Sequence, residues 1–247
     1  QTSSSSFNSI LATHFTNEEL KHNNLADGSE VYPPQSGISE SHLNSIIARV
    51  NYTLLSRYNV TATFRADNSS RFAASHRWGY FPSIGLSWNI DKERFLIGNQ
   101  TLNGLKLRLS FGTVGNQEIS DHAFSTSYKT SQYAGSSSYS TNNTRNDDLK
   151  WETTASYNVG IDADFFSRRL SAVLDVYFKK TRDLLLDVPM GFSSGVTSQI
   201  QNVGNVENKG VELQLTGVVA KTADLTVNVS ANIAHNSNAI TDMGSTN

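Results

Sequence analysis

A period of two over residues 149–180 constrains the fold more than any other feature of this sequence. Alternate positions are apolar on both sides of a short reversal at Ser167-Arg168, and the positions between them are mostly polar. Successive side chains of a β-strand point to opposite faces, so the pattern predicts a long β-hairpin with one apolar and one polar face. The predicted apolar face comprises Ala155, Tyr157, Val159, Ile161, Ala163, Phe165, Leu170, Ala172, Leu174, Val176 and Phe178.

The same alternation recurs along the rest of the chain and predicts about eight strands in all. No helical period competes with it. The connections expected to be compact are 56–57, 91–104, 167–168 and 220–224, and those expected to be long are 68–76, 114–148 and 181–203. Because the two kinds alternate, all the long connections are expected at one end of the sheet. Residues 1–42 show no sustained period and are predicted to be an irregular loop or insertion, with a short helix around Asn17 to His22.

Composition excludes several classes of protein. The 247 residues carry 20 basic and 22 acidic side chains, a net charge of −2, so no global field points to nucleic acid. Cysteine is absent, which excludes disulfides and thiolate metal sites. The sequence contains no window of 18 consecutive apolar residues, so it predicts no transmembrane helix. Gln1 is followed by no secretory signal pattern, and we expect the chain to be a processed form or a piece of a longer protein.

The solvent that meets each face decides the architecture. Two-faced strands usually pack on a soluble core, but these are about 10 to 16 residues long, against about 5 to 6 in most globular sheets. Every strand repeats the apolar face, with no second sheet or helix to cover it, and the opposite face is too ionic for a protein interior. These features predict an antiparallel transmembrane β-barrel segment, apolar toward lipid and polar toward a wet lumen. The candidate lumen-lining residues are Arg65, Asp67, Arg108, Asp162, Asp164, Asp175, Lys179 and Glu212.

Several blocks of sequence then resemble one family. RADNSSRF, RWGYFPSIGLSWNI, LKLRLSFGTVGNQEI, NDDLKWETTASYNVGIDADFF and NVGNVENKGVEL occur in the order typical of SusC/RagA-type TonB-dependent outer-membrane transporters. The resemblance runs from about Leu43 to His235. It implies a 22-stranded barrel in the bacterial outer membrane, crossed many times by the chain, with residues 43–247 forming the later part of its wall.

The resemblance also implies partners and a transport cycle. Members of this family import glycans or peptides together with a SusD-like surface lipoprotein that acts as a lid. Energy reaches the barrel through TonB, which contacts an N-terminal part that this sequence does not contain. A soluble all-β carbohydrate-binding or adhesin domain and a small self-closed eight-stranded barrel remain the alternatives.

No pattern in the sequence predicts catalysis, a cofactor or a metal site. The six histidines, at positions 14, 22, 42, 76, 122 and 235, show no ligand spacing, and no nucleophile motif is present. One interpretation is that a glycosidase carboxylate pair lies among Asp162, Asp164 and Asp175. The favoured interpretation makes them lumen-wall charges that face Arg169 and Lys179.

The long region 120–146 is rich in Tyr, Ser and Asn. Tyr128, Tyr133 and Tyr139 are candidates for stacking on a sugar or for contacting the lid protein. An ordinary solvated outer loop is the alternative interpretation of the same residues.

Overall fold

The computed structural model describes residues 1–15, 24–25, 28–32, 34–133 and 136–244. The helix expected around Asn17 to His22 lies outside these residues. The chain divides into two compact units, residues 1–43 and 44–247. Among the described residues, none of the helical segments is long and apolar enough to cross a membrane.

In the first unit, residues expected to be irregular form strands instead. β1 (Thr2–Ser9) pairs antiparallel with the first part of β4 (Gln35–Leu54), and β2 (Ala12–Phe15) pairs with β3 (Gly28–Val31). The prediction of an irregular region over residues 1–42 was therefore wrong. All eight residues of β1 are exposed and five of them are serine, so neither face carries the apolar period from which strands were predicted.

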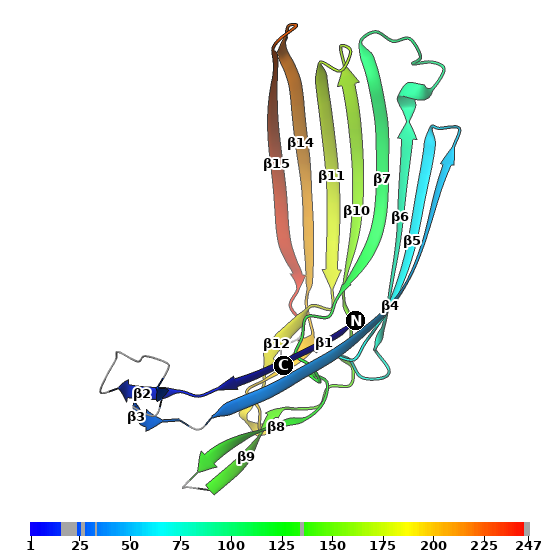
Figure 1. The fold of residues 1–247 in the computed structure, drawn as a ribbon. Helices are drawn as coiled ribbons and strands as arrows, with labels where there is room; N and C mark the ends of the chain where they lie inside the picture. The colour runs from blue at the N-terminus through cyan, green and yellow to red at the C-terminus, as the bar shows by residue number, and fades with distance from the viewer. Residues whose placement is uncertain (16–23, 26–27, 33, 134–135, 245–247) are drawn as a thin grey trace. The chain divides into compact units, whose positions relative to one another are not determined.

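The second unit is built on eight neighbouring strands in the order β4-β5-β6-β7-β10-β11-β14-β15 (Figure 1), which confirms the predicted antiparallel sheet. After the second part of β4, its members are β5 (Tyr58–Ser69), β6 (Trp78–Asn89), β7 (Leu102–Asn116), β10 (Glu152–Phe165), β11 (Leu170–Arg182), β14 (Asn205–Lys221) and β15 (Thr226–Asp242). Within the described residues the sheet remains open and does not close into a barrel.

Compact connections lie at one end of this sheet, which we call the short-turn end. Leu55 and Ser56 both have positive φ, as in the two-residue turns whose twist matches that of a hairpin. The β6–β7 connection contains a 3-10 turn, η3 (Ile90–Lys92). The opposite, long-loop end carries further structure within its connections: the hairpin of β8 (Ser127–Tyr133) and β9 (Ser136–Asn143), and the hairpin of β12 (Leu185–Pro189) and β13 (Ser198–Asn202) around η4 (Phe192–Ser194).

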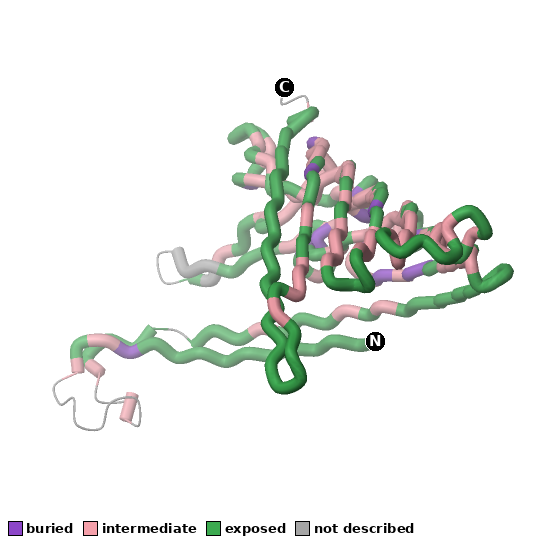
Figure 2. Tube along the Cα trace, turned by 90° about the horizontal axis from the view of Figure 1, so that it is seen from above, coloured by how far each residue is buried: buried purple, intermediate pink, exposed green. Residues whose placement is uncertain are grey.

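The hydrogen-bond register places the apolar side chains in rows across the sheet. One row runs from β5 to β14 and comprises Val60, Leu86, Leu109, Val159, Val176 and Val211. These side chains face outward without cover: Val159 and Val176 are each 45% exposed. Figure 2 shows that most residues along the strands are exposed or half-buried.

Full burial occurs chiefly in a small core at the long-loop end. Phe72 and Leu149 are 0% exposed and Trp151 is 7% exposed. The Trp151 ring lies 5.2 Å from the ring of Phe72 and 5.4 Å from that of Phe81, and its Nε1 donates to the Arg77 carbonyl at 3.0 Å. This core joins the β5–β6 connection and the β7–β10 connection to strand β6.

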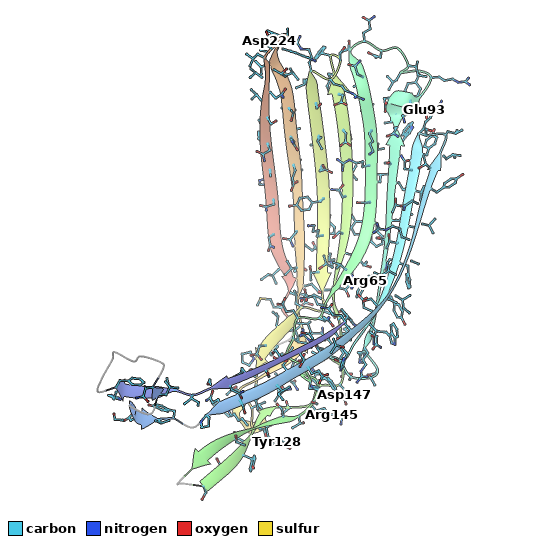
Figure 3. All side chains as sticks on the ribbon, viewed as in Figure 1. Arg65, Glu93, Tyr128, Arg145, Asp147 and Asp224 are labelled. Carbon is cyan, nitrogen blue, oxygen red and sulfur yellow. The ribbon has the colours of Figure 1, made fainter. Side chains whose placement is uncertain are left out.

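A second cluster links the elements of the short-turn end. The Glu93 carboxylate accepts hydrogen bonds from the Tyr58 hydroxyl (2.7 Å) and the Trp88 indole (3.1 Å), and pairs with Arg57 at 2.9 Å. Figure 3 shows Glu93 beside the 3-10 turn that follows β6. The hydrogen bonds from Tyr58 and Trp88, followed by the charge of Arg57, hold the pKa of Glu93 below its ordinary value.

We expect Trp151→Ala to destabilise the long-loop end by about 3–5 kcal/mol, because it removes a buried ring that three segments share. Hydrogen exchange of the amides near residues 72–77 and 117–123 measures the effect. Trp78→Ala is the matched control, because Trp78 is 46% exposed. Equal protection in the two variants would show that this core does not hold the loops.

The low pKa of Glu93 predicts a pH-dependent contact at the short-turn end. A depressed carboxyl pKa contributes stability above the unfolded value, and this contribution is lost as the pH falls through the folded pKa. We therefore expect the Trp88 indole N–H resonance to shift only below pH 4.5, the ordinary value for Glu93. Glu93→Gln should abolish the transition, and a midpoint above pH 4.5 would contradict the assignment.

Candidate functional site

The centre of the polar face is an ion network on three adjacent strands. Arg108 of β7 donates to Asp162 of β10 from Nε at 3.0 Å and from Nη2 at 2.7 Å, and its Nη2 also reaches Asp175 of β11 at 3.0 Å. The three side chains are between 22% and 35% exposed. Pairs to a planar guanidinium combine charge with fixed geometry, so this network orients all three groups.

Gly160 makes room for this network. The register places Arg108, Gly160 and Asp175 opposite one another on β7, β10 and β11. A Cβ atom on residue 160 would lie 2.6 Å from Cζ of Arg108 and 2.5 Å from Oδ1 of Asp175. The absent side chain therefore lets the arginine lie across the middle strand and reach a carboxylate two strands away.

The partners of the carboxylates differ from those predicted. Sequence reasoning assigned Arg169 and Lys179 to Asp162, Asp164 and Asp175, but Arg108 binds Asp162 and Asp175. Asp164 instead accepts from the Ser171 hydroxyl at 2.6 Å and lies 3.7 Å from Arg168. The prediction failed because strand alternation fixes which face a residue occupies but not which cross-strand neighbour it reaches.

The remaining candidates of the polar face have other surroundings. Arg65 pairs with Asp67 of its own strand at 2.8 Å, and Asp67 is buried. Lys179 lies over the Tyr177 ring, 5.3 Å from its centre. Glu212 is exposed and lies opposite Asp175 in the register.

The geometry gives the carboxylates no catalytic arrangement. Asp162 and Asp175 share one guanidinium, whereas glycoside hydrolysis requires one carboxyl that is free to donate a proton. In the part of the chain that the structure describes, no group of three or more His, Asp or Glu side chains could hold a metal ion.

The tyrosines of the long-loop end are partly described. Tyr128 is 69% exposed and Tyr139 is 73% exposed. Tyr128 lies opposite Thr141 and Tyr139 opposite Thr130, so the two tyrosines share one face of the β8–β9 hairpin. Figure 3 shows Tyr128 on this hairpin. Tyr133 ends β8, and its side chain lies outside the described part of the structure.

One exposed aromatic residue at the long-loop end was not among the residues predicted from the sequence. Phe192 of η4 is fully exposed, in the segment GFSSG. It borders a cleft of about 480 Å³ between the β8–β9 hairpin and residues 190–197, whose lining includes Lys129, Thr141 and Met190. An aromatic residue between small, turn-forming residues is the signal that could have identified it.

Comparison with known proteins now decides the family. Residues 4–247 match the family model described as TonB dependent receptor-like, beta-barrel. The chain belongs to this family. It is 40% identical over 210 residues to TonB-dependent receptor SusC of Bacteroides thetaiotaomicron, covering 81% of this chain and 21% of SusC. It is 37% identical over 232 residues to TonB-dependent receptor P3 of Formosa agariphila, covering 92% of this chain and 23% of P3.

Solved structures agree with this assignment. The RagAB peptide importer in its closed-closed state matches with a TM-score of 0.84 at 32% identity, covering 98% of this chain and 27% of that chain. The siderophore receptor PirA from Pseudomonas aeruginosa, at 14% identity and a TM-score of 0.57, shares the fold alone. The resemblance to SusC/RagA-type receptors is therefore confirmed, and the named relatives are receptors rather than enzymes. The chain spans about a quarter of the length of these relatives.

We expect Gly160→Val to displace Arg108 from Asp175 and to destabilise the sheet by about 1–3 kcal/mol through overpacking. The midpoint of chemical unfolding measures the change. Gly85→Val is the matched control, because Gly85 lies in β6 and a Cβ atom there meets nothing within 4 Å. A Gly160 variant as stable as the Gly85 variant would contradict the packing described for Arg108.

Proposed function

We propose that this chain forms part of the barrel wall of a TonB-dependent outer-membrane importer for oligosaccharides or peptides. Its apolar face contacts membrane lipid, and its polar face lines a wet lumen. Residues 44–247 supply the membrane-spanning strands, and the long connections at 68–76, 114–148 and 181–203 form outer loops. The protein crosses the bacterial outer membrane many times.

The observation that carries this proposal is the contrast between the two faces of one sheet. The apolar rows are uncovered, with Ile161, Leu174 and Val176 between 37% and 45% exposed. The other face of the same strands carries the Arg108 network. A soluble protein rarely leaves so large an apolar surface in water, whereas a transmembrane barrel requires apolar residues outside and polar residues inside.

Aromatic side chains bound the apolar band and indicate how the strands cross it. On β6 the band runs from Trp88, stacked near Tyr58, to Tyr80. On β10 it runs from Phe165 to Tyr157. Through β7, the register aligns Trp88 of β6 with Ile161 of β10, which lies four residues before Phe165. It likewise aligns Tyr157 of β10 with Ile84 of β6, which lies four residues after Tyr80. Both edges are thus displaced in the same direction, as strands tilted in a membrane require.

The lumen and the loops provide the route for substrate. Arg65, Asp67, Arg108, Asp162, Asp164, Asp175, Lys179 and Glu212 line the path. Tyr128, Tyr139 and Tyr133 contact substrate or a SusD-like surface lipoprotein, which the exposure of the first two supports. Relatives named as TonB-dependent receptors and the RagAB peptide importer support the coupling to TonB and the import of a polymer fragment.

Substitutions at two adjacent residues test the assignment of the faces in the full-length receptor. Leu174→Arg should cost about 2–4 kcal/mol for a charge near the bilayer midplane, and should lower the amount of receptor in the outer membrane. Asp175→Asn should be mild, because Arg108 keeps its contacts with Asp162. Heat-modified gel mobility of membrane fractions measures assembly. Equal assembly of the two variants would contradict the proposal.

A further inference from the structure

Three cationic side chains interrupt the apolar face near the long-loop end. Lys180 and Arg182 follow Phe178 at alternate positions of β11, and Lys209 of β14 lies opposite Phe178. Lys180 Nζ contacts Glu207 Oε1 at 2.6 Å, which shows that both side chains point to the same side of the sheet. Lys179, by contrast, lies over the ring of Tyr177 on the polar face.

These cations lie at the boundary of the apolar band. The Phe178 ring is 6.3 Å from the ring of Tyr157, which is 4.9 Å from that of Phe111. Lys209 shares this aromatic row, whereas Lys180 and Arg182 lie two and four residues beyond it. Aromatic rows of this kind mark the level of the lipid headgroups. Long cationic side chains at the same level can rest their stems on apolar surface and present their charges to headgroups.

The nearby carboxylates do not neutralise all three of these cations. Lys180 is neutralised by Glu207. Within the described part of the chain, Arg182 and Lys209 take part in no ion pair, and both are exposed. Asp183 pairs with Lys150, whereas Asp242 accepts from the neutral Asn205, which lies opposite Arg182, and so keeps its negative charge. Lys180, Arg182 and Lys209 thus outnumber Glu207 and Asp242, and the surface keeps a net positive charge beside the apolar face.

We propose that Lys209, Arg182 and Lys180 bind the phosphate headgroup of an anionic membrane lipid on the loop side of the bilayer. Its acyl chain lies along the apolar face of β14, where Val211 and Leu215 are 44% and 40% exposed. Ammonium and guanidinium groups are the usual donors to phosphate, and the apolar positions of β14 follow Lys209 along the same face of the strand. The inference rests on the proposed function, since it requires the apolar face to meet lipid.

Glu207 competes with the lipid for Lys180, and this competition gives variants of opposite sign. Lys209→Gln should weaken retention of an anionic lipid about fivefold, the effect of one cation near a charged membrane surface. Glu207→Gln should strengthen retention, because it releases Lys180. Lys179→Gln, one residue from Lys180 and on the opposite face, should leave retention unchanged. A purely structural role for these residues would give no gain with Glu207→Gln.

The experiment uses the full-length receptor in nanodiscs of phosphatidylcholine, with or without phosphatidylglycerol. Native mass spectrometry counts the phosphatidylglycerol that remains bound after release from the disc. The proposal is overturned if Lys209→Gln and Lys179→Gln retain the lipid alike, or if Glu207→Gln lowers retention. Loss of the lipid on addition of inorganic phosphate would identify a site for free anions and overturn the lipid assignment.

The same experiment separates this inference from the proposed function. Receptor that enters both kinds of nanodisc without preferring phosphatidylglycerol refutes the headgroup site alone. Receptor that enters neither kind refutes the membrane assignment and the headgroup site together.

Discussion

The hydrogen-bond register of the antiparallel strands is the constraint on which the rest of the structure depends. It aligns Ile161 with Leu107 and Leu174 on one face, while Gly160 aligns with Arg108 and Asp175 on the other. Side chains alternate with a period of two, so a slip of one residue between two strands would exchange the faces of one of them. Such a slip would place charged groups in the apolar row. A single register must therefore keep the apolar residues on one face and the charged residues on the other.

Glycine lets large side chains lie flat on the polar face. Arg108 crosses Gly160, and the Tyr177 ring lies over Gly210, where a Cβ atom would come within 2.6 Å of it. These positions have ordinary strand dihedrals, so the requirement is for space and not for a special backbone conformation. Side chains that lie along the sheet keep its charges paired across neighbouring strands, and this places the Arg108 network at the surface proposed to line the lumen.

The two ends of the sheet are stabilised differently. Glu93 links neighbouring elements of the short-turn end through polar contacts with Tyr58, Trp88 and Arg57. At the long-loop end, Trp151 packs with Phe72 and Phe81, and the loops acquire a buried core. Long connections need such a core because ordering them costs conformational entropy that turns of a few residues avoid. The exposed Tyr128, Tyr139 and Phe192 lie on segments of the same end.

The sequence by itself determined the eight two-faced strands and their long and short connections, because apolar alternation is local and is written into each strand. The family followed from the resemblance of several sequence blocks to SusC/RagA-type receptors. It did not reveal β1, whose serine-rich residues are exposed on both faces and carry no period. Only the tertiary structure decided that Arg108 holds both Asp162 and Asp175, and that Lys180 pairs with Glu207 on the apolar face. Those contacts depend on how strands distant in sequence are aligned, and on the space left by a glycine between them.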